Sequence, residues 1–188
     1  MSGLKALPQE RVRELFDYDA GTGELVWRTL TNNRVKVGAV AGTPRADGYR
    51  KISVDGRFYL THRLVWLWHH GELPQYLDHI DRDPSNNRIE NLRPATSIQN
   101  GGNMSKRSGT SSQWKGVCWS KRTRKWQANI RVNDKLRHLG RFTCEADAAQ
   151  AYNGAAHEAF GEFACLNSHP ANELLFAELM RDEHEVVA

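Results

Sequence analysis

The spacing of hydrophobic residues predicts that the chain begins with one short helix and continues in strands. Val12, Leu15 and Phe16 fall on one face of a helix expected over residues 9–16, which follows Pro8. Beyond it, hydrophobic and polar residues alternate around Gly and Asp-Gly turns, as in antiparallel strands. These strands are expected over residues 24–29, 49–54 and 57–60.

A helix, a strand pair and a second helix are predicted next. The first helix is expected over residues 62–70, between the capping residue Thr61 and the terminating residue Gly71. Thr96 is expected to cap the second helix, which carries Asn100. The two strands, separated by a loop rich in Asp and Asn, are expected over residues 77–80 and 92–95.

The second half of the chain has a different pattern. Residues 101–113 have the Gly, Ser and Asn composition of a linker and contain the expected domain boundary. An amphipathic helix with a small-residue inner face is expected over residues 145–160, with Gly161 at its end, and residues 170–185 favour one more, acidic helix. Three strands precede these helices, over residues 116–121, 125–132 and 136–142. The fold class expected for the whole chain is α+β.

Charge is strongly segregated along the chain, although the net charge is only +4. Residues 104–141 carry 11 basic and 1 acidic side chains, a net +10, whereas residues 142–188 carry 1 basic and 9 acidic, a net −8. A charge run is often only a solvated face. Here it is interleaved with Trp114, Trp119 and Trp126 on predicted strands, which favours a phosphate-binding sheet.

The composition argues against several other classes of protein. The three cysteines, at positions 118, 144 and 165, lack Cys-x-x-Cys spacing, so neither a disulfide framework nor a structural zinc site is expected. No apolar run approaches the roughly 20 residues of a membrane span, and residues 1–8 have no signal-peptide core. We therefore expect a cytoplasmic protein that contacts no membrane.

Residues 77–100 carry the side chains that point most directly to chemistry. Asp78 and His79 are adjacent, and the amides of Asn91 and Asn100 follow. A carboxylate and an amide oxygen suit a hard ion such as Mg²⁺, and a neutral histidine can take a proton from water near pH 7. These are the residue types needed to cut a phosphodiester bond with one metal ion.

The order and spacing of these residues resemble the HNH endonucleases of phages and introns, in the homing-type variant whose last motif residue is Asn. The resemblance covers roughly residues 7–103 and is specific over the motif, 77–103. It implies a ββα-metal fold preceded by a β-rich extension. It further implies that His79 is the general base, that Asn91 pins the loop and orients His79, and that Mg²⁺ or Mn²⁺ is bound by Asp78 and Asn100.

Residues around this motif are less specific. His62 and Arg63 open the preceding helix and could approach the phosphate, as similar residues do in many relatives, but a buried, hydrogen-bonded His62 is about as compatible with the pattern. The remaining polar residues of the loop are expected to form turns: Asp81, Asp83, Asn86 and Asn87.

Four segments of the second half resemble an AP2 domain: residues 114–117, 125–131, 138–142 and 145–152. The resemblance spans residues 113–167 and implies a three-stranded antiparallel sheet, packed on one helix, whose exposed face binds the major groove of duplex DNA. Plant members place arginines where this chain has Cys118 and Ser120, so their base preference does not transfer.

Strand alternation alone supports the same division of faces. It turns Val117, Ala128, Ile130, Leu139 and Phe142 toward the helix and leaves the intervening residues, Cys118 and Ser120 among them, on the open face. Trp126 is expected to pack rather than to contact DNA. The predicted DNA-binding residues are Lys106, Arg107, Lys115, Ser120, Arg122, Arg124, Lys125, Gln127, Asn129 and Arg131.

The sequence therefore predicts a two-module, metal-dependent endonuclease of a phage or mobile element, acting as a monomer on double-stranded DNA. The expected organisation is a nuclease domain at 1–103, a basic linker at 104–113, an AP2-like domain at 114–168 and an acidic tail at 169–188. The competing hypothesis is a non-catalytic DNA-binding or regulatory protein with a degenerate HNH site. A structured RNA target is a weaker alternative, because the sheet lacks a run of aromatic residues for stacking bases.

Overall fold

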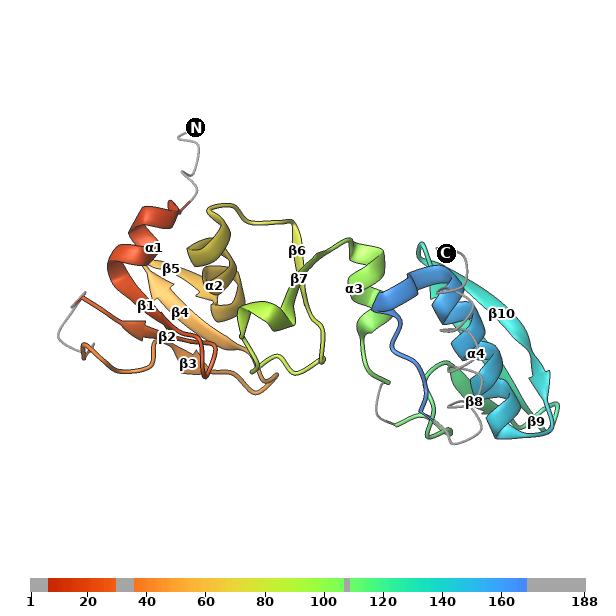
Figure 1. The fold of residues 1–188 in the computed structure, drawn as a ribbon. Coiled ribbons are helices and arrows are strands. Elements are labelled where there is room, and N and C mark those ends of the chain that lie inside the picture. The colour runs from red at the N-terminus through yellow and green to blue at the C-terminus, as the bar shows by residue number, and fades with distance from the viewer. Residues whose placement is uncertain (1–6, 30–35, 107–108, 169–188) are drawn as a thin grey trace. The chain divides into compact units, whose positions relative to one another are not determined.

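The chain divides into two compact units, residues 1–100 and 101–188 (Figure 1). The computed structural model describes residues 7–29, 36–106 and 109–168; the predicted acidic helix over residues 170–185 and the predicted DNA contact Arg107 lie outside these ranges. Within them, no helix is long and apolar enough to cross a lipid bilayer.

The first unit opens with helix α1 (Gln9–Leu15) and two small antiparallel sheets. The first sheet pairs β1 (Phe16–Asp19) with β2 (Glu24–Trp27). The second has the order β3-β4-β5, with bounds Thr43–Pro44, Arg50–Val54 and Arg57–Leu60. The predicted helix and hairpin are thus confirmed, whereas β1 and β3 were not predicted.

The first helix is one residue shorter than predicted. Leu15 is its last residue, and Phe16 opens β1, where it is the cross-strand partner of Trp27. Their ring centroids lie 4.6 Å apart. Phe16 is therefore buried, as the helical spacing indicates, but in a strand pair that the sequence pattern does not separate from the helix.

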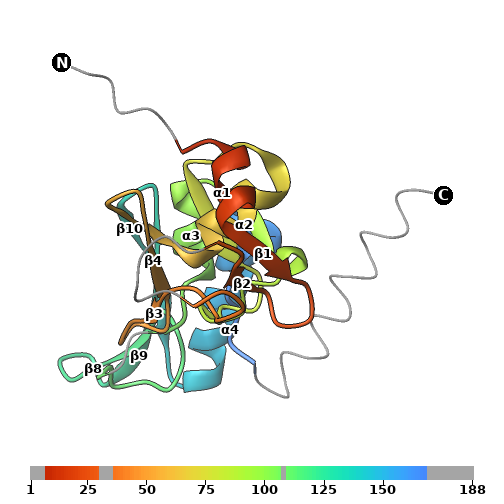
Figure 2. The same ribbon diagram turned by 90° about the vertical axis from the view of Figure 1, so that its left-hand side faces the viewer.

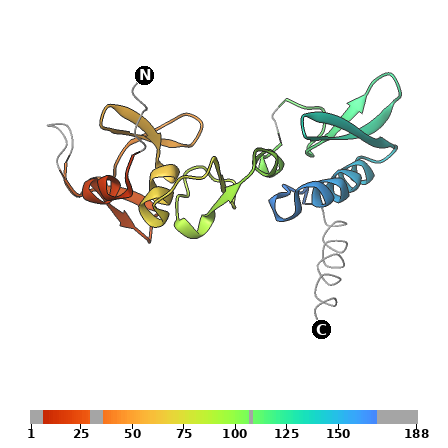
Figure 3. The same ribbon diagram turned by 90° about the horizontal axis from the view of Figure 1, so that it is seen from above.

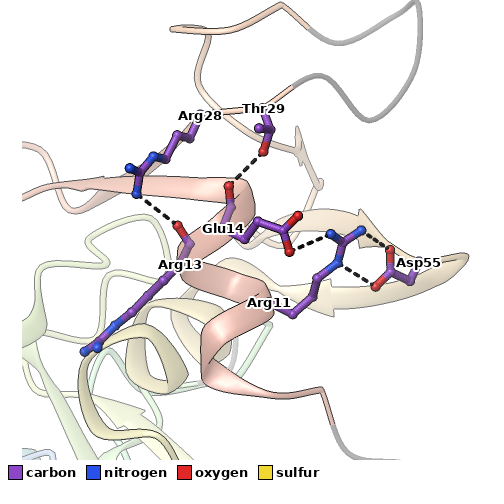
Figure 4. Close-up of polar contacts among 6 residues, drawn as sticks. All are labelled: Arg11, Arg13, Glu14, Arg28, Thr29 and Asp55. Carbon is purple, nitrogen blue, oxygen red and sulfur yellow. Dashed lines mark hydrogen bonds and ion pairs between the residues drawn. The ribbon is translucent and has the colours of Figure 1, made fainter.

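Polar contacts tie α1 to both sheets (Figure 4). The guanidinium of Arg11 donates to both carboxylate oxygens of Asp55, at 3.1 and 2.9 Å, and to Glu14 at 2.8 Å. At the end of β2, the Thr29 hydroxyl donates to the Glu14 carbonyl at 2.8 Å and Arg28 donates to the Arg13 carbonyl at 3.4 Å. Because these contacts are exposed, they contribute little to the free energy of unfolding, although they fix the position of α1.

Helix α2 (Thr61–His70) lies beside α1 and covers the core of this unit (Figure 2). It ends at Gly71 as predicted, with Gly71 in the left-handed region and its N–H donating to the Leu67 carbonyl. The predicted capping role of Thr61 is wrong, because Leu60 occupies the cap position and the Thr61 hydroxyl donates to the Arg50 carbonyl at 3.1 Å. The buried core consists of Val12, Leu15, Phe16, Leu25, Trp27, Ala41, Ile52, Val54, Leu64, Val65, Leu67 and Leu92.

A strand pair and a helix follow α2. Strand β6 (Tyr76–His79) pairs antiparallel with β7 (Leu92–Ala95), and the short helix η1 (Ile89–Asn91) precedes β7. The predicted first strand is shifted by one residue, and the predicted second strand is confirmed. Helix α3 (Ser97–Asn103) begins after Thr96, whose hydroxyl accepts from the Gln99 N–H at 3.2 Å while the Gln99 side chain accepts from the Thr96 N–H at 2.8 Å. This reciprocal capping box confirms the predicted cap.

The second unit contains a three-stranded antiparallel sheet with the order β8-β9-β10 and one long helix. Helix α4 (Glu145–Phe160) lies along one face of this sheet and is followed by the short helix η2 (Gly161–Phe163) (Figure 3). Trp126 packs against the resulting core, as predicted. The strands are Val117–Ser120, Lys125–Val132 and Lys135–Phe142.

The two ends of the second unit are held together by buried amides. The Asn153 side chain donates to the Asn167 carbonyl at 2.9 Å and accepts from the Asn167 N–H at 2.8 Å. The Asn167 side chain in turn accepts from the Lys115 N–H at 2.7 Å and donates to the Lys115 carbonyl at 3.0 Å. The Cys165 N–H donates to the Gly102 carbonyl at 3.1 Å. The segment after η2 is thus bound to the segment before β8.

Candidate active site and nucleic-acid interface

Strand β6 carries the adjacent pair Asp78 and His79 at its end, where both side chains are buried. Their partners across the hairpin are Arg93 and Leu92. Asn100 is half-buried in α3, and its N–H donates to the Thr96 carbonyl.

Two aromatic side chains from other elements pack around His79. The His62 ring, in the first turn of α2, lies 5.0 Å from the His79 ring, edge to face. Tyr49, just before β4, lies 5.9 Å from the His79 ring and 5.4 Å from the His62 ring. The His79 imidazole is therefore enclosed by His62 and Tyr49, of which the sequence indicates only His62.

Burial keeps both histidines neutral. It is the main cause that lowers the pKa of His79, although the hydrogen bond to Asn87 and the nearby carboxylates of Asp81, Asp78 and Asp83 act in the opposite direction. For His62, burial lowers the pKa to about 3, and repulsion by His79 in its protonated form and by Arg63 acts in the same direction. Near neutral pH, His79 therefore has the lone pair that a base requires.

The amide of Asn87 fixes which nitrogen of His79 carries the hydrogen. Its oxygen lies 3.3 Å from Nε2 of His79, and its nitrogen donates to the Ser85 carbonyl at 3.2 Å. Because this amide oxygen can only accept, Nε2 must carry the hydrogen, and Nδ1 is the basic nitrogen of the neutral ring. The sequence predicts only a turn-forming role for Asn87. Its spacing from His79 is the single sequence signal for the contact between the two side chains.

Asn91 binds the loop between β6 and β7 at three points. Its side-chain nitrogen donates to the Asp81 carboxylate at 2.9 Å and to the Asn86 carbonyl at 2.8 Å, and its oxygen accepts from the Asp81 N–H at 3.0 Å. The Asp81 carboxylate also accepts from the Asn86 side chain and from the Asp83 N–H. This buried amide therefore holds the chain on both sides of the loop, directly after His79.

The N-terminal extension supports the same loop from outside. The Tyr18 hydroxyl accepts from the Ile89 N–H at 2.9 Å, and the Arg88 guanidinium donates to the Gly21 carbonyl. Gly23 has a φ of +77°, and a β-carbon placed there would lie 2.3 Å from the Arg88 nitrogen. Only glycine allows this approach, which brings the β1–β2 turn against the loop.

Two arginines of this unit are bound within it. Arg63 donates to the carbonyls of Pro74 and Gln75, at 3.0 and 3.4 Å, so it holds the segment that leads into β6. Arg93 donates through Nε to the Asp78 carboxylate at 3.0 Å, and both side chains are largely buried. The sequence does not single out Arg93, which comes opposite Asp78 only in the observed register of β6 and β7.

Asp78 in β6 and Asn100 in α3 are of residue types that a hard divalent cation accepts. Carboxylate and amide oxygens, here from Asp78 and Asn100, are the ligands that Mg²⁺ accepts, with water completing its shell. Within the described residues, no three side chains of His, Cys, Asp or Glu gather into a metal cluster. A cation at this position would therefore depend on amide, water and substrate oxygens besides one carboxylate.

In the second unit, the open face of the sheet is polar and basic. The buried residues Val117, Ala128 and Ile130 point toward α4, so Gln127, Asn129 and Arg131 point away from it. Because antiparallel partners share a face, the strand register adds His138, opposite Asn129, and Arg141, opposite Gln127. The Asn129 amide oxygen lies 3.0 Å from Nδ1 of His138 and accepts its hydrogen. Neither His138 nor Arg141 was among the predicted contacts.

The other predicted DNA contacts of this unit are spread over three places. The turn between β8 and β9 carries the exposed side chains of Arg122, Arg124 and Lys125, with Ser120 at its start. Lys106 is half-buried in the segment after α3. The Lys115 ammonium donates to the Gly102 carbonyl at 2.7 Å and lies over the Tyr152 ring, which assigns it a structural contact.

Comparison with known proteins finds similarity to HNH endonucleases in the first unit. Residues 59–101 match the family model described as HNH endonuclease. An uncharacterised HNH endonuclease of Acanthamoeba polyphaga mimivirus is 39% identical over 125 residues, which are 64% of this chain and 63% of that protein. Protein 3.8 of Escherichia phage T7 is 36% identical over 76 residues, 39% of this chain and 63% of that protein. No solved structure matches the chain significantly. The chain thus spans about 63% of the length of these two relatives, and the likeness to HNH endonucleases that the family model shows covers residues 59–101.

Proposed function

We propose that this protein is a metal-dependent endonuclease that hydrolyses phosphodiester bonds in duplex DNA. The observation that carries the proposal is the buried, neutral His79, held through Nε2 by Asn87 and placed beside Asp78 at the end of β6. The family match over residues 59–101, which include these residues, supports the same activity.

In the proposed reaction, His79 removes a proton from the attacking water at Nδ1. Asn87 keeps the hydrogen of Nε2 in place throughout, and His62 and Tyr49 hold the ring against rotation. Asn91 keeps the loop after His79 closed. Asp78 and Asn100 would hold one Mg²⁺ or Mn²⁺, which would stabilise the negative charge that develops on the phosphate and on the departing 3′-oxygen as the P–O bond breaks.

DNA is bound by the second unit in this proposal. The open face of the β8-β9-β10 sheet offers side chains that can reach base edges, namely Gln127, Asn129 and Arg131. The exposed Arg122, Arg124 and Lys125 of the β8–β9 turn bind phosphates and set the register on the duplex. The sheet packed on α4 is the arrangement expected for an AP2-like domain, which we propose as the targeting module.

The test uses the full-length protein and supercoiled plasmid, with MgCl₂, with MnCl₂ or with EDTA. The wild type should convert the plasmid to nicked or linear DNA only with a divalent ion, and His79→Ala should reduce the rate at least ~10²-fold while binding persists. Asp78→Ala and Asn100→Ala should each weaken the metal-supported cleavage. Asn133→Gly, in an exposed turn of the second unit, is the control and should cleave as the wild type does.

Two outcomes would contradict the proposal. Cleavage that persists in EDTA would show that the reaction needs no metal ion. Cleavage that persists in His79→Ala would show that His79 is not the general base. Tight duplex binding without any cleavage in either metal would instead favour a DNA-binding protein with a degenerate HNH site.

A further inference from the structure

The ion pair between Asp78 and Arg93 is built into the hairpin that carries the proposed active site. The two residues are direct cross-strand partners in β6 and β7. Arg93 Nε lies 3.0 Å from Asp78 Oδ2, and the exposed fractions of the two side chains are 15% and 5%. Strand pairing therefore fixes the guanidinium beside this carboxylate in a site largely removed from water.

This position has two consequences for a cation at Asp78. The charge-assisted bond holds Oδ2 and so fixes the plane of the carboxylate, which determines the direction in which Oδ1 points. The guanidinium also brings a permanent positive charge within a few ångströms of any cation that binds there. In a buried site such repulsion is screened less than on the surface, so it lowers the affinity for the ion.

We propose that Arg93 is a positioning residue that makes metal binding at Asp78 depend on bound DNA. This inference rests on the proposed endonuclease function. In the free protein, Arg93 neutralises Asp78 and holds metal affinity low. A DNA phosphate at the site adds the negative charge and the oxygen ligands that the ion needs. The ion is then acquired together with the substrate, and by linkage it tightens DNA binding by the same factor.

The experiment measures Mn²⁺ binding directly, by calorimetry and by the paramagnetic resonance signal of free Mn²⁺. It uses the full-length protein, and all variants are compared in the same buffer. Arg93→Gln should bind Mn²⁺ at least about tenfold more tightly than the wild type, within the range typical of coupled sites. Arg93→Lys, which keeps the charge, should remain close to the wild type. Arg93→Gln combined with Asp78→Asn should lose the gain, which would locate the ion at Asp78.

A second measurement needs no change at Arg93 and covers the case in which Arg93→Gln does not fold. In the His79→Ala protein, which should bind DNA without cutting it, a saturating duplex should tighten Mn²⁺ binding at least about tenfold. Equal Mn²⁺ affinity with and without duplex would overturn the inference, as would a folded Arg93→Gln protein with unchanged or weaker affinity. Failure of the proposed function is read separately, as absence of plasmid cleavage by the wild type.

Discussion

The amide oxygen of Asn87 lies 3.3 Å from Nε2 of His79, and the same amide donates to the Ser85 carbonyl. Because the amide nitrogen of Asn87 donates to the Ser85 carbonyl, the amide oxygen is the end that faces His79. A residue of the connecting loop therefore determines the tautomer of the proposed base. The loop is thus part of the proposed active site and more than a connection between β6 and β7.

Asn87→Ala should lower the cleavage rate constant about tenfold or more, in the range seen when an orienting hydrogen bond is removed. DNA affinity should be unchanged, since the contact lies outside the open face of the sheet. Asn87→Asp keeps an acceptor for Nε2 and should recover part of the loss. Single-turnover cleavage and duplex binding in EDTA separate the two effects. An Asn87→Ala protein with the wild-type rate would show that the tautomer is fixed in another way.

Burial of His62 makes stability depend on pH. Its pKa of about 3 in the folded protein lies below the ordinary value of 6.5 that the unfolded chain retains. Between these values the unfolded chain binds the extra proton, so the free energy of unfolding falls as pH is lowered, by up to about 1.4 kcal/mol per pH unit. Above pH 6.5 this contribution is fully present.

Urea unfolding at several pH values between neutral and about 4.5 would measure this dependence. His62→Gln removes the titrating group and should give a shallower pH dependence than the wild type. Equal slopes in the two proteins would contradict the prediction. Other buried histidines titrate in both proteins and cancel in the comparison.

Gly23→Ala should destabilise the first unit by about 2 kcal/mol or more, because it combines a strained φ with a clash against the backbone of Arg88. Gly38→Ala is the matched control. Gly38 has a similar φ of +85°, but a β-carbon there has nothing within 4 Å, so only the conformational cost of about 1 kcal/mol is expected. Urea unfolding compares the two variants, and equal losses would contradict the close approach between the β1–β2 turn and the loop.

The exposed cations of the β8–β9 turn should govern the salt dependence of DNA binding. Combined Arg122→Ala, Arg124→Gly and Lys125→Ala should weaken binding to all duplexes and reduce the slope of log affinity against log salt by about 2 to 3. Glycine is used at position 124 because Arg124 has a φ of +48°. Gln127→Ala should instead alter which sequences are preferred and leave the slope unchanged. An unaltered slope in the triple variant would show that these three side chains do not bind phosphates and are only a solvated surface.

The elements that sequence patterns predict well are those with strong local signals. The helix over Glu145–Phe160 has the predicted bounds, and the cap at Thr96 forms as its side chain and Gln99 indicate. Thr61 is also a favoured capping residue, but Leu64 follows it where Gln99 follows Thr96. It does not cap, because Leu60 occupies the cap position and Thr61 is the first residue of the helix. Its hydroxyl donates instead to the Arg50 carbonyl of a neighbouring strand, a contact that only tertiary structure brings about.

The residues of the candidate site likewise fall into two groups: those that can be recognised from the sequence and those that only tertiary structure brings together. Adjacent residues such as Asp78 and His79 can be recognised from spacing, since the motif is contiguous. Tyr49 and Arg93 could not be selected in this way, because they approach His79 and Asp78 only after the β-rich extension and the hairpin have formed. Likewise, His138 and Arg141 are three residues apart yet share the open face, because the register shifts between His138 and Gly140; strict alternation along the strand does not predict this.

The amide contacts that join Asn167 to Lys115, with the bond from Cys165 to Gly102, bring the first segment of the second unit beside residues 165–167, where its described part ends. A fold whose first and last described segments meet can be attached to another protein at one place without stretching either chain. The described part of the second unit has this geometry, and it keeps its own closure wherever it is attached.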